Sequence, residues 1–178
     1  MSKSENILQT IAERTRERIA HESEERPLDQ VVGEARRLAE KELEDDGSFR
    51  FPFERALRAP GMSFICECKK ASPSRGVIAE DFDPVAIARD YEAAGAAAIS
   101  CLTEPSWFQG RDEYLSAIAN AVSIPVLRKD FVVDEYMIYQ AKVLGAQAVL
   151  LICSILTDEQ LVRYVSLAHE LGLSALVE

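Results

Sequence analysis

The feature of this sequence that most constrains its fold is a strand–helix alternation that begins at Phe64 and repeats along the chain. Short apolar runs typical of β-strands recur, and each is followed by a segment with helical periodicity. Strands separated by single helices pair in parallel, because each crossover returns the chain to the same end of the sheet. The predicted strands are 64–69, 97–103, 126–129, 148–154 and 175–178.

The predicted helices between these strands have recognisable ends. Asp83-Pro84 opens a helix that ends at Gly95, and a further helix covers 112–122. The remaining two begin at Asp134 and at the capping sequence 157–160, and they end at Gly145 and Gly172. Each predicted strand is therefore separated from the next by one helix.

This repeat implies an α/β fold, either a (β/α)₈ barrel or a doubly wound sheet. No Gly-x-Gly-x-x-Gly follows the first strand, which lowers the dinucleotide-binding option. Charged residues recur at the carboxyl ends of the strands, where barrel active sites lie. We therefore expect a TIM-barrel type of fold with about five strands in this chain. The charged residues at the carboxyl ends of the strands are Glu67, Lys69, Glu104, Lys129 and Glu178.

The first sixty residues have a different pattern. Ile7, Ile11 and Ile19 lie among many charges, which predicts a surface helix that ends at Pro27. A second helix is expected over 31–43, and residues 51–53 start a short segment with apolar anchors. We predict an N-terminal helical extension at 1–60 and a partial barrel at 61–178.

Composition excludes several kinds of partner. The 178 residues include 30 acidic and 20 basic ones, a formal net charge of −10, and there is no local basic patch. Nucleic acid and membrane surfaces are therefore not expected partners. The polar N-terminus and the lack of any apolar run near about 20 residues predict a cytoplasmic protein. Four cysteines are expected to be small buried hydrophobes, and their spacing predicts no metal site: Cys66, Cys68, Cys101 and Cys153.

The strand-end charges form the candidate site. Side chains alternate across a strand, so Glu67 and Lys69 share one face, and Lys129 points away from Arg128. If the apolar face points inward, Glu67, Lys69 and Lys129 project into the barrel mouth, and Glu178 joins them by the same rule. Two lysines and two carboxylates suit acid/base work on a small anionic substrate. A structural ion pair is an equally weighted alternative for Glu67.

Two neighbouring segments could complete such a site. The polar loop 72–76 is either a mobile lid over the mouth or a plain connection. Trp107 and Phe108 follow the second strand, where they either stack on an aromatic substrate or pack locally.

Several motifs, in order, carry a resemblance to a known family. They are Glu67-Cys-Lys69-Lys-Ala-Ser72-Pro73-Ser74-x-Gly76, Leu102-Thr103-Glu104 with Phe108-x-Gly110, Leu127-Arg-Lys129-Asp130-Phe131, Leu150-Leu151-Ile152 and Leu176-Val-Glu178. Together they resemble indole-3-glycerol phosphate synthase of tryptophan biosynthesis, from about residue 5 to residue 178.

The resemblance implies a carboxy-lyase that closes the indole ring of 1-(2-carboxyphenylamino)-1-deoxyribulose 5-phosphate, with loss of carbon dioxide and water. It implies Lys129 as the general acid, Glu178 as the carboxylate of the dehydration step and Glu67 as an orienting carboxylate. Lys69 corresponds to a mobile lysine that holds the substrate's anionic groups and can also donate a proton. No metal or cofactor is implied. The resemblance places these residues at the substrate: Ser72, Ser74, Phe108, Phe131, Leu150 and Ile152.

The chain departs from the family at Glu178, after five of eight strands. We expect a truncated form, without the later phosphate-binding loops and with weak or no activity alone. Two other readings stay open. One is a different phosphate-binding barrel, such as phosphoribosylanthranilate isomerase or the tryptophan synthase α subunit. The other is a non-catalytic fragment that pairs its open edges with a second copy or a complementary fragment.

Overall fold

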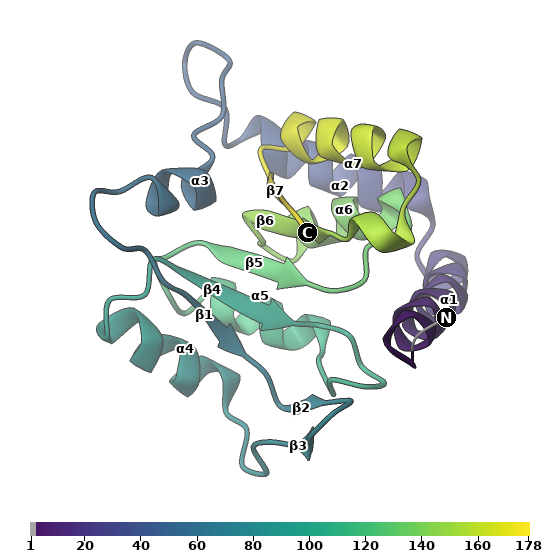
Figure 1. The fold of residues 1–178 in the computed structure, drawn as a ribbon. Helices are drawn as coiled ribbons and strands as arrows, with labels where there is room; N and C mark the ends of the chain where they lie inside the picture. Colours follow the sequence, from purple (N-terminus) through teal and green to yellow (C-terminus); the bar gives the residue numbers. More distant parts are fainter. Residues whose placement is uncertain (1–2) are drawn as a thin grey trace.

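The sheet that the sequence predicts is present. A computed structural model describes residues 3–178, with side-chain surroundings from residue 7. Five strands form one parallel sheet in the order β1-β4-β5-β6-β7 (Figure 1). Each strand thus pairs with the one that follows it after a helix, as a barrel requires. The bounds are β1 Ile65–Cys68, β4 Ala98–Leu102, β5 Val126–Lys129, β6 Ala148–Leu151 and β7 Ser174–Val177.

The register aligns side chains into rows across the sheet. One row runs through Glu67, Ser100, Leu127, Ala148 and Ser174. Residues in one row of a parallel sheet point to the same face, and those two positions along each strand point there as well. Because Leu127 and Ala148 belong to an apolar cluster on the concave face, the whole row faces the barrel interior.

A short helix covers the amino end of this interior. α3 (Pro52–Leu57) contributes Phe53, which is 2% exposed and packs with Ala98, Leu127 and Ala148. Figure 1 shows α3 on the side of the sheet opposite to the ends toward which β4 and β5 point. The apolar anchor expected at 51–53 therefore fills the bottom of the partial barrel.

Four helices pack around the outside of the sheet, and their ends follow the predicted signals. The side chains of Asp83 and Asp134 accept hydrogen bonds from backbone N–H groups of the first turns, and Thr157 and Gln160 form a capping box. The following glycines take left-handed conformations, for example Gly95 at φ 91°. The bounds are α4 Pro84–Ala93, α5 Asp112–Ala119, α6 Glu135–Val143 and α7 Asp158–Glu170.

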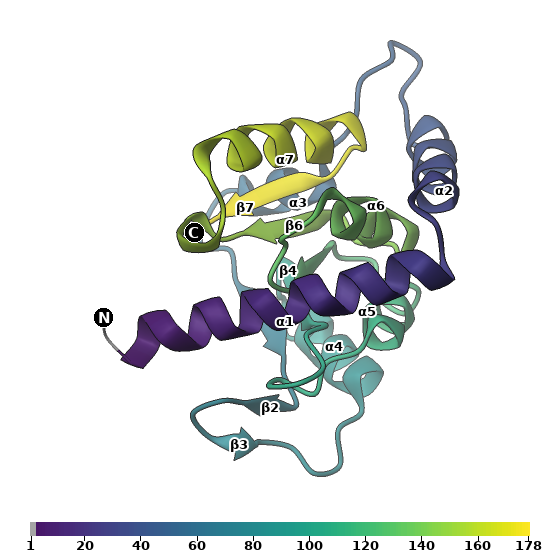
Figure 2. The same ribbon diagram turned by 90° about the vertical axis from the view of Figure 1, so that its right-hand side faces the viewer.

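Two further helices form most of the N-terminal part. α1 (Lys3–Glu25) crosses the molecule as a long rod (Figure 2), and α2 (Leu28–Glu40) packs on α6. α1 is amphipathic, since Ile11 and Ile19 are buried among exposed charges. α2 begins three residues earlier than predicted, because Pro27 serves as its N-cap.

Three local expectations need correction. The polar loop 72–76 is a hairpin of β2 (Ala71–Ser72) and β3 (Gly76–Val77), not an irregular loop. The fourth predicted strand ends at Leu151, and a 3₁₀ turn, η1 (Cys153–Ile155), follows it. As a result Cys153 is exposed and is not a buried hydrophobe, whereas Cys68 and Cys101 are buried as expected. None of the helices in the described part of the chain is long and apolar enough to cross a membrane.

Candidate active site at the carboxyl ends of the strands

Lys129 and Glu178 come together at the mouth of the partial barrel. Lys129 ends β5 and Glu178 follows β7, with β6 between them. The Lys129 Nζ atom lies 3.9 Å from Glu178 Oε1, and the two side chains are 31% and 53% exposed. A half-exposed pair at this distance gains little stability from its attraction. Both groups therefore remain accessible to a ligand in the mouth.

Glu67 and Lys69 form a second ion pair on β1. The Lys69 ammonium donates a hydrogen bond to Glu67 Oε1, and each side chain is about one-third exposed. Glu67 shares the inward row with Leu127, two positions before Lys129. The alternation rule thus correctly placed Glu67 on the same face as Lys129, and the ion pair that was weighed as an alternative is also present.

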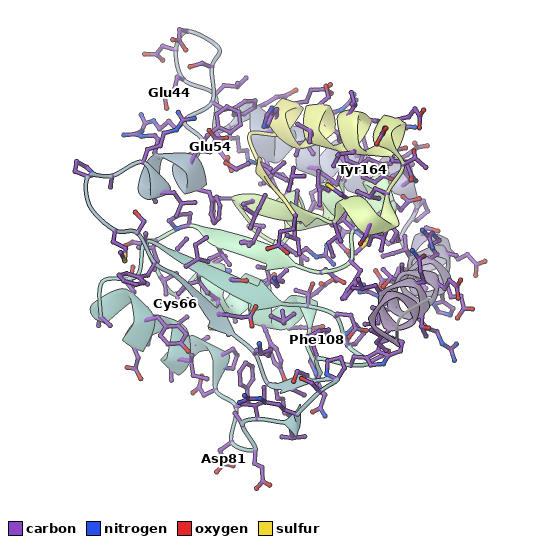
Figure 3. All side chains as sticks on the ribbon, in the orientation of Figure 1. Glu44, Glu54, Cys66, Asp81, Phe108 and Tyr164 are labelled. Carbon is purple, nitrogen blue, oxygen red and sulfur yellow. The ribbon has the colours of Figure 1, made fainter. Side chains whose placement is uncertain are left out.

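Aromatic and aliphatic side chains lie at or after the carboxyl ends of β4, β5 and β6. Phe108 lies on the loop after β4 (Figure 3). Its ring centroid is 6.2 Å from that of Phe131, which follows β5. Leu150 is buried in β6, and Ile152 is half-buried beyond that strand. We call the Phe108–Phe131 pair the aromatic wall, and a pair of this kind suits the ring of an aromatic ligand.

The β2–β3 hairpin borders the same mouth. Ala71 N donates a hydrogen bond to the Phe108 carbonyl at 3.2 Å, so the hairpin is attached to the loop that carries the aromatic wall. The hydroxyl oxygens of Ser72 and Ser74 are 3.5 Å apart at the turn. Ser72 is half-buried and Ser74 is exposed.

A buried charge network lies behind Lys129, and the sequence analysis did not find it. Asp130 is fully buried and accepts hydrogen bonds from Arg18 of α1 at 3.0 Å and from the Thr103 hydroxyl at 2.7 Å. Burial by itself would raise the pKa of Asp130, but the charges of Arg18 and Arg128 together with the hydrogen bonds from Thr103 and Phe131 N lower that pKa below its ordinary value. Asp130 is therefore held as a carboxylate.

Arg128 extends this network to two outer helices. Its guanidinium is fully buried and bonds Asp112 of α5 at 3.0 Å and the Gln140 amide oxygen of α6 at 2.8 Å. Gln140 in turn donates to Glu22 of α1. The signal was in the sequence: alternation turns Arg128 outward, under the helices, where a charge needs partners. The bonded pairs Arg128–Gln140, Arg128–Asp112 and Gln140–Glu22 are 12, 16 and 118 residues apart in sequence.

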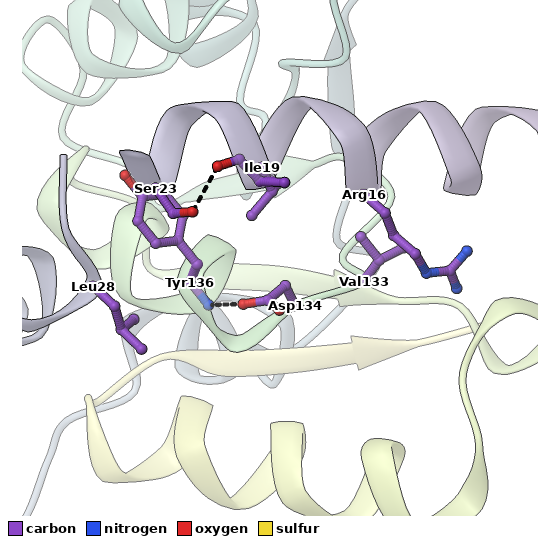
Figure 4. A pocket seen from close by; sticks show the side chains of 8 residues that line it. Arg16, Ile19, Ser23, Leu28, Val133, Asp134 and Tyr136 are labelled. Atoms are coloured by element: carbon purple, nitrogen blue, oxygen red, sulfur yellow. Dashed lines mark hydrogen bonds between the residues drawn. The ribbon is translucent and has the colours of Figure 1, made fainter. Parts of the chain in front are cut away.

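One pocket lies away from the predicted site residues. A pocket of about 390 Å³ lies between α1 and the start of α6, where Ile19, Leu28 and Tyr136 line it together with Asp134 (Figure 4). Among the described residues no group of three or more His, Cys, Asp or Glu side chains is placed to hold a metal ion.

The fold and the site define a class of protein. A parallel β/α sheet with ammonium and carboxylate groups at the carboxyl ends of its strands is the arrangement of the β/α-barrel class of proteins. The family comparison agrees with this class. The model of the family described as indole-3-glycerol phosphate synthase matches residues 8–178.

Individual relatives give the same family. The chain is 52% identical over 176 residues to the indole-3-glycerol phosphate synthase of Lachnoclostridium phytofermentans, which covers 97% of this chain and 65% of the relative. For the protein of the same name from Ruminiclostridium cellulolyticum the identity is 49% over 172 residues, 97% of this chain and 64% of the relative. A Neisseria meningitidis protein of that name is 58% identical over 114 residues, 64% of this chain and 44% of the relative.

The chain therefore belongs to the indole-3-glycerol phosphate synthase family, as its motifs indicated. It spans about 65% of the length of the first two relatives.

Proposed function

We propose that this chain carries the proton-transfer half of an indole-3-glycerol phosphate synthase site. The reaction would convert 1-(2-carboxyphenylamino)-1-deoxyribulose 5-phosphate to indole-3-glycerol phosphate, carbon dioxide and water. The observation that carries the proposal is the meeting of Lys129 and Glu178 at 3.9 Å, in a mouth that also holds the Glu67–Lys69 pair. The name of the relatives supplies the product, and the family resemblance of the motifs supplies the substrate.

The proposed steps use side chains of this chain alone. The ring carbon that bears the carboxylate attacks the ribulose carbonyl, while Lys129 donates a proton to the carbonyl oxygen. The carboxylate leaves as carbon dioxide and its bonding electrons restore the ring. The new hydroxyl accepts a proton from the Lys69 ammonium and leaves as water, and Glu178 takes the proton released from the neighbouring carbon as the indole double bond forms. The net uptake of one proton from solvent is the proton that loss of a carboxylate as carbon dioxide requires.

Other residues would bind and orient the substrate. Glu67 would orient Lys69, and the Lys69 ammonium would hold the substrate's anionic groups. Phe108, Phe131, Leu150 and Ile152 would enclose the aromatic ring, with Ser72 and Ser74 at the border of the site. We include no metal or cofactor in this proposal, because proton transfer by these groups accounts for each step.

The decisive experiment is an assay for indole fluorescence after addition of the substrate. Because the chain spans about 65% of its relatives, it should be assayed alone and together with the remaining segment of the Lachnoclostridium protein, supplied as a separate polypeptide. Product in either mixture supports the proposal. If neither mixture makes product while the whole Lachnoclostridium protein does, this chain lacks the activity.

Lys129 itself is tested in the mixture that has activity. Lys129→Ala should lower turnover by roughly two to four orders of magnitude, the usual contribution of a positioned general acid, with little change in Tm. Lys41→Ala, an exposed lysine after α2, is the matched control and should leave turnover unchanged. Activity of Lys129→Ala near that of the control would refute the general-acid role.

A second candidate function is self-association through the sheet edges. β1 and β7 are the two outer strands. Phe64 and Ile65 are 57% and 38% exposed, and Val177 is 45% exposed. Exposed apolar residues on a sheet edge favour pairing with another chain. Light scattering that gives a monomer mass at micromolar concentration would count against this candidate.

We also place the protein in the cytoplasm as part of this proposal. The relatives' named product serves amino-acid biosynthesis, and a reducing compartment would keep the exposed thiol of Cys153 reduced. Cell fractionation with an antibody against the chain checks this location.

A further inference from the structure

The loop between β4 and α5 is organised by one buried carboxylate. Glu104 is only 2% exposed although it follows a strand end. Its Oε1 accepts a hydrogen bond from Ser106 N at 2.8 Å, and its Oε2 accepts from Trp107 N at 2.7 Å and Phe108 N at 3.1 Å. A carboxylate has the lone pairs to accept all three, and such charge-assisted bonds are stronger than neutral ones.

The backbone of this loop is sterically restricted at two positions, Gln109 and Gly110. Gln109 has a φ of 51°, in the left-handed region that residues other than glycine rarely enter. Gly110 passes so close to β4 that an added Cβ would lie 2.4 Å from the Leu102 carbonyl oxygen. Strained positions persist where surrounding contacts over-determine them. The three hydrogen bonds to Glu104 supply such contacts on the side of the loop that leads to Phe108.

The β4–α5 loop contacts both Phe131 and the β2–β3 hairpin. The Phe108 ring faces Phe131, and the Phe108 carbonyl accepts the hydrogen bond from Ala71 that attaches the β2–β3 hairpin. The buried Glu104 carboxylate therefore bonds directly to Phe108, and Phe108 in turn bonds the hairpin through its carbonyl.

We propose that Glu104 is a positioning residue, which fixes the Phe108 ring and the β2–β3 hairpin so that the mouth accepts an aromatic substrate. This inference rests on the proposed function for the identity of the substrate. Glu104 does not itself touch the ligand; it acts through the backbone of residues 106–108.

The first test is amide hydrogen exchange on the full chain, which needs no ligand. In Glu104→Gln one carboxylate oxygen becomes an NH₂ group, which meets a backbone N–H donor and cannot accept its hydrogen bond. We expect the amides of Ser106, Trp107 and Phe108 to exchange about tenfold faster or more, as for the loss of a charge-assisted bond. Amides of β5 should be unchanged, as should the whole pattern in the control Glu113→Gln, an exposed glutamate on the next helix.

The second test separates positioning from general stability. Trp107 is the chain's single tryptophan, so its fluorescence reports on this loop. Titration with the carboxyphenylamino-deoxyribulose phosphate should give a Kd about tenfold higher for Glu104→Gln than for the unmodified chain. Thr157→Ala, which removes the cap of the distant α7, lowers stability without touching the loop and should leave Kd unchanged.

The outcomes are distinct. Unchanged exchange at residues 106–108, or a Kd for Glu104→Gln equal to that of the unmodified chain, overturns the positioning role. If the unmodified chain binds no substrate and makes no product with the added segment, the proposed function fails, and exchange alone then decides whether Glu104 orders the loop. If Glu104→Gln does not fold, Glu104→Asp replaces it, with intermediate exchange rates expected because the carboxylate is retained on a shorter stem.

Discussion

Asp130→Asn is the substitution that most directly tests the buried charge network behind Lys129. The Asp130 side chain has no exposed surface and accepts hydrogen bonds from Arg18, Thr103 and Phe131 N, at 3.0, 2.7 and 2.8 Å. Arg128, also fully buried, lies 3.6 Å away. Asparagine has nearly the same shape, so the change removes charge and acceptor capacity without opening a cavity.

The expected loss in free energy of unfolding depends on the partners that Arg18 and Arg128 keep when the Asp130 charge is removed. In Asp130→Asn the guanidinium of Arg128 keeps Asp112, but Arg18 loses its buried partner and retains Glu22 at 3.6 Å. Removing one member of a buried pair while leaving its partner typically costs about 3–5 kcal/mol. Because both arginines keep a second carboxylate, we expect about 3 kcal/mol, the lower end of that range.

The measurement is urea unfolding of the full chain at pH 7, followed by circular dichroism. Asp45→Asn, at an exposed turn residue, is the matched control and should change the free energy of unfolding by less than about 0.5 kcal/mol. A loss for Asp130→Asn no larger than that of the control would refute the reasoning. It would mean that the desolvation of the three charges cancels their attraction.

The same pair of proteins gives a pH dependence with a defined sign. Burial opposes ionisation of Asp130, but the charges of Arg18 and Arg128 and the hydrogen bonds from Thr103 and Phe131 N together lower its folded-state pKa below the ordinary value. A carboxyl with a lowered pKa stabilises the fold fully above its unfolded pKa of about 3.9 and loses that contribution as pH falls through the folded value. The stability difference between the unmodified chain and Asp130→Asn should therefore stay constant from pH 7 to about pH 5 and shrink only at lower pH. A difference that already shrinks above pH 5 would contradict the lowered pKa.

Two further predictions concern the core and the thiols. Phe53→Ala should lower the free energy of unfolding by about 3–5 kcal/mol in urea, because Phe53 is 2% exposed and fills the interior below Leu127; a loss under about 1 kcal/mol would show that α3 does not plug the barrel. A thiol reagent at pH 8 should label exposed Cys153 well before Cys68 and Cys101, since burial raises the pKa of Cys68 to about 12 and raises that of Cys101 as well. Mass spectrometry of the labelled peptides checks this order, and equal labelling of Cys68 and Cys153 would contradict it.

The elements of the fold were largely predictable because their signals are local. Apolar runs marked the five parallel strands, and caps at Asp83, Asp134 and Thr157 marked three helix starts. The sequence did not predict the β2–β3 hairpin, whose two short strands are defined by their pairing with each other. The β2–β3 hairpin depends on bonds to the Lys70 carbonyl from Ile78 and Ala79, and no apolar alternation announces it.

In the candidate site, too, the local signals were predictable and the long-range partners were not. Strand alternation placed Glu67 and Lys129 on the inner face, and the register agrees. It also turned Arg128 outward, but it could not supply the partners Arg18 and Asp112, which come from separate helices. Glu104 was visible as a strand-end charge, yet its role depends on the direction of three backbone N–H groups that follow it.

By itself, the sequence determined the class of fold, the order of strands and helices, the family and the charged residues that face the mouth. These follow from periodicity, caps and motifs, which are properties of neighbouring residues. Only the tertiary structure decided which charges are paired, which are buried and which loops they hold, such as the attachment of α1 to Asp130. Such contacts join residues far apart in the chain, and their energies depend on burial and distance.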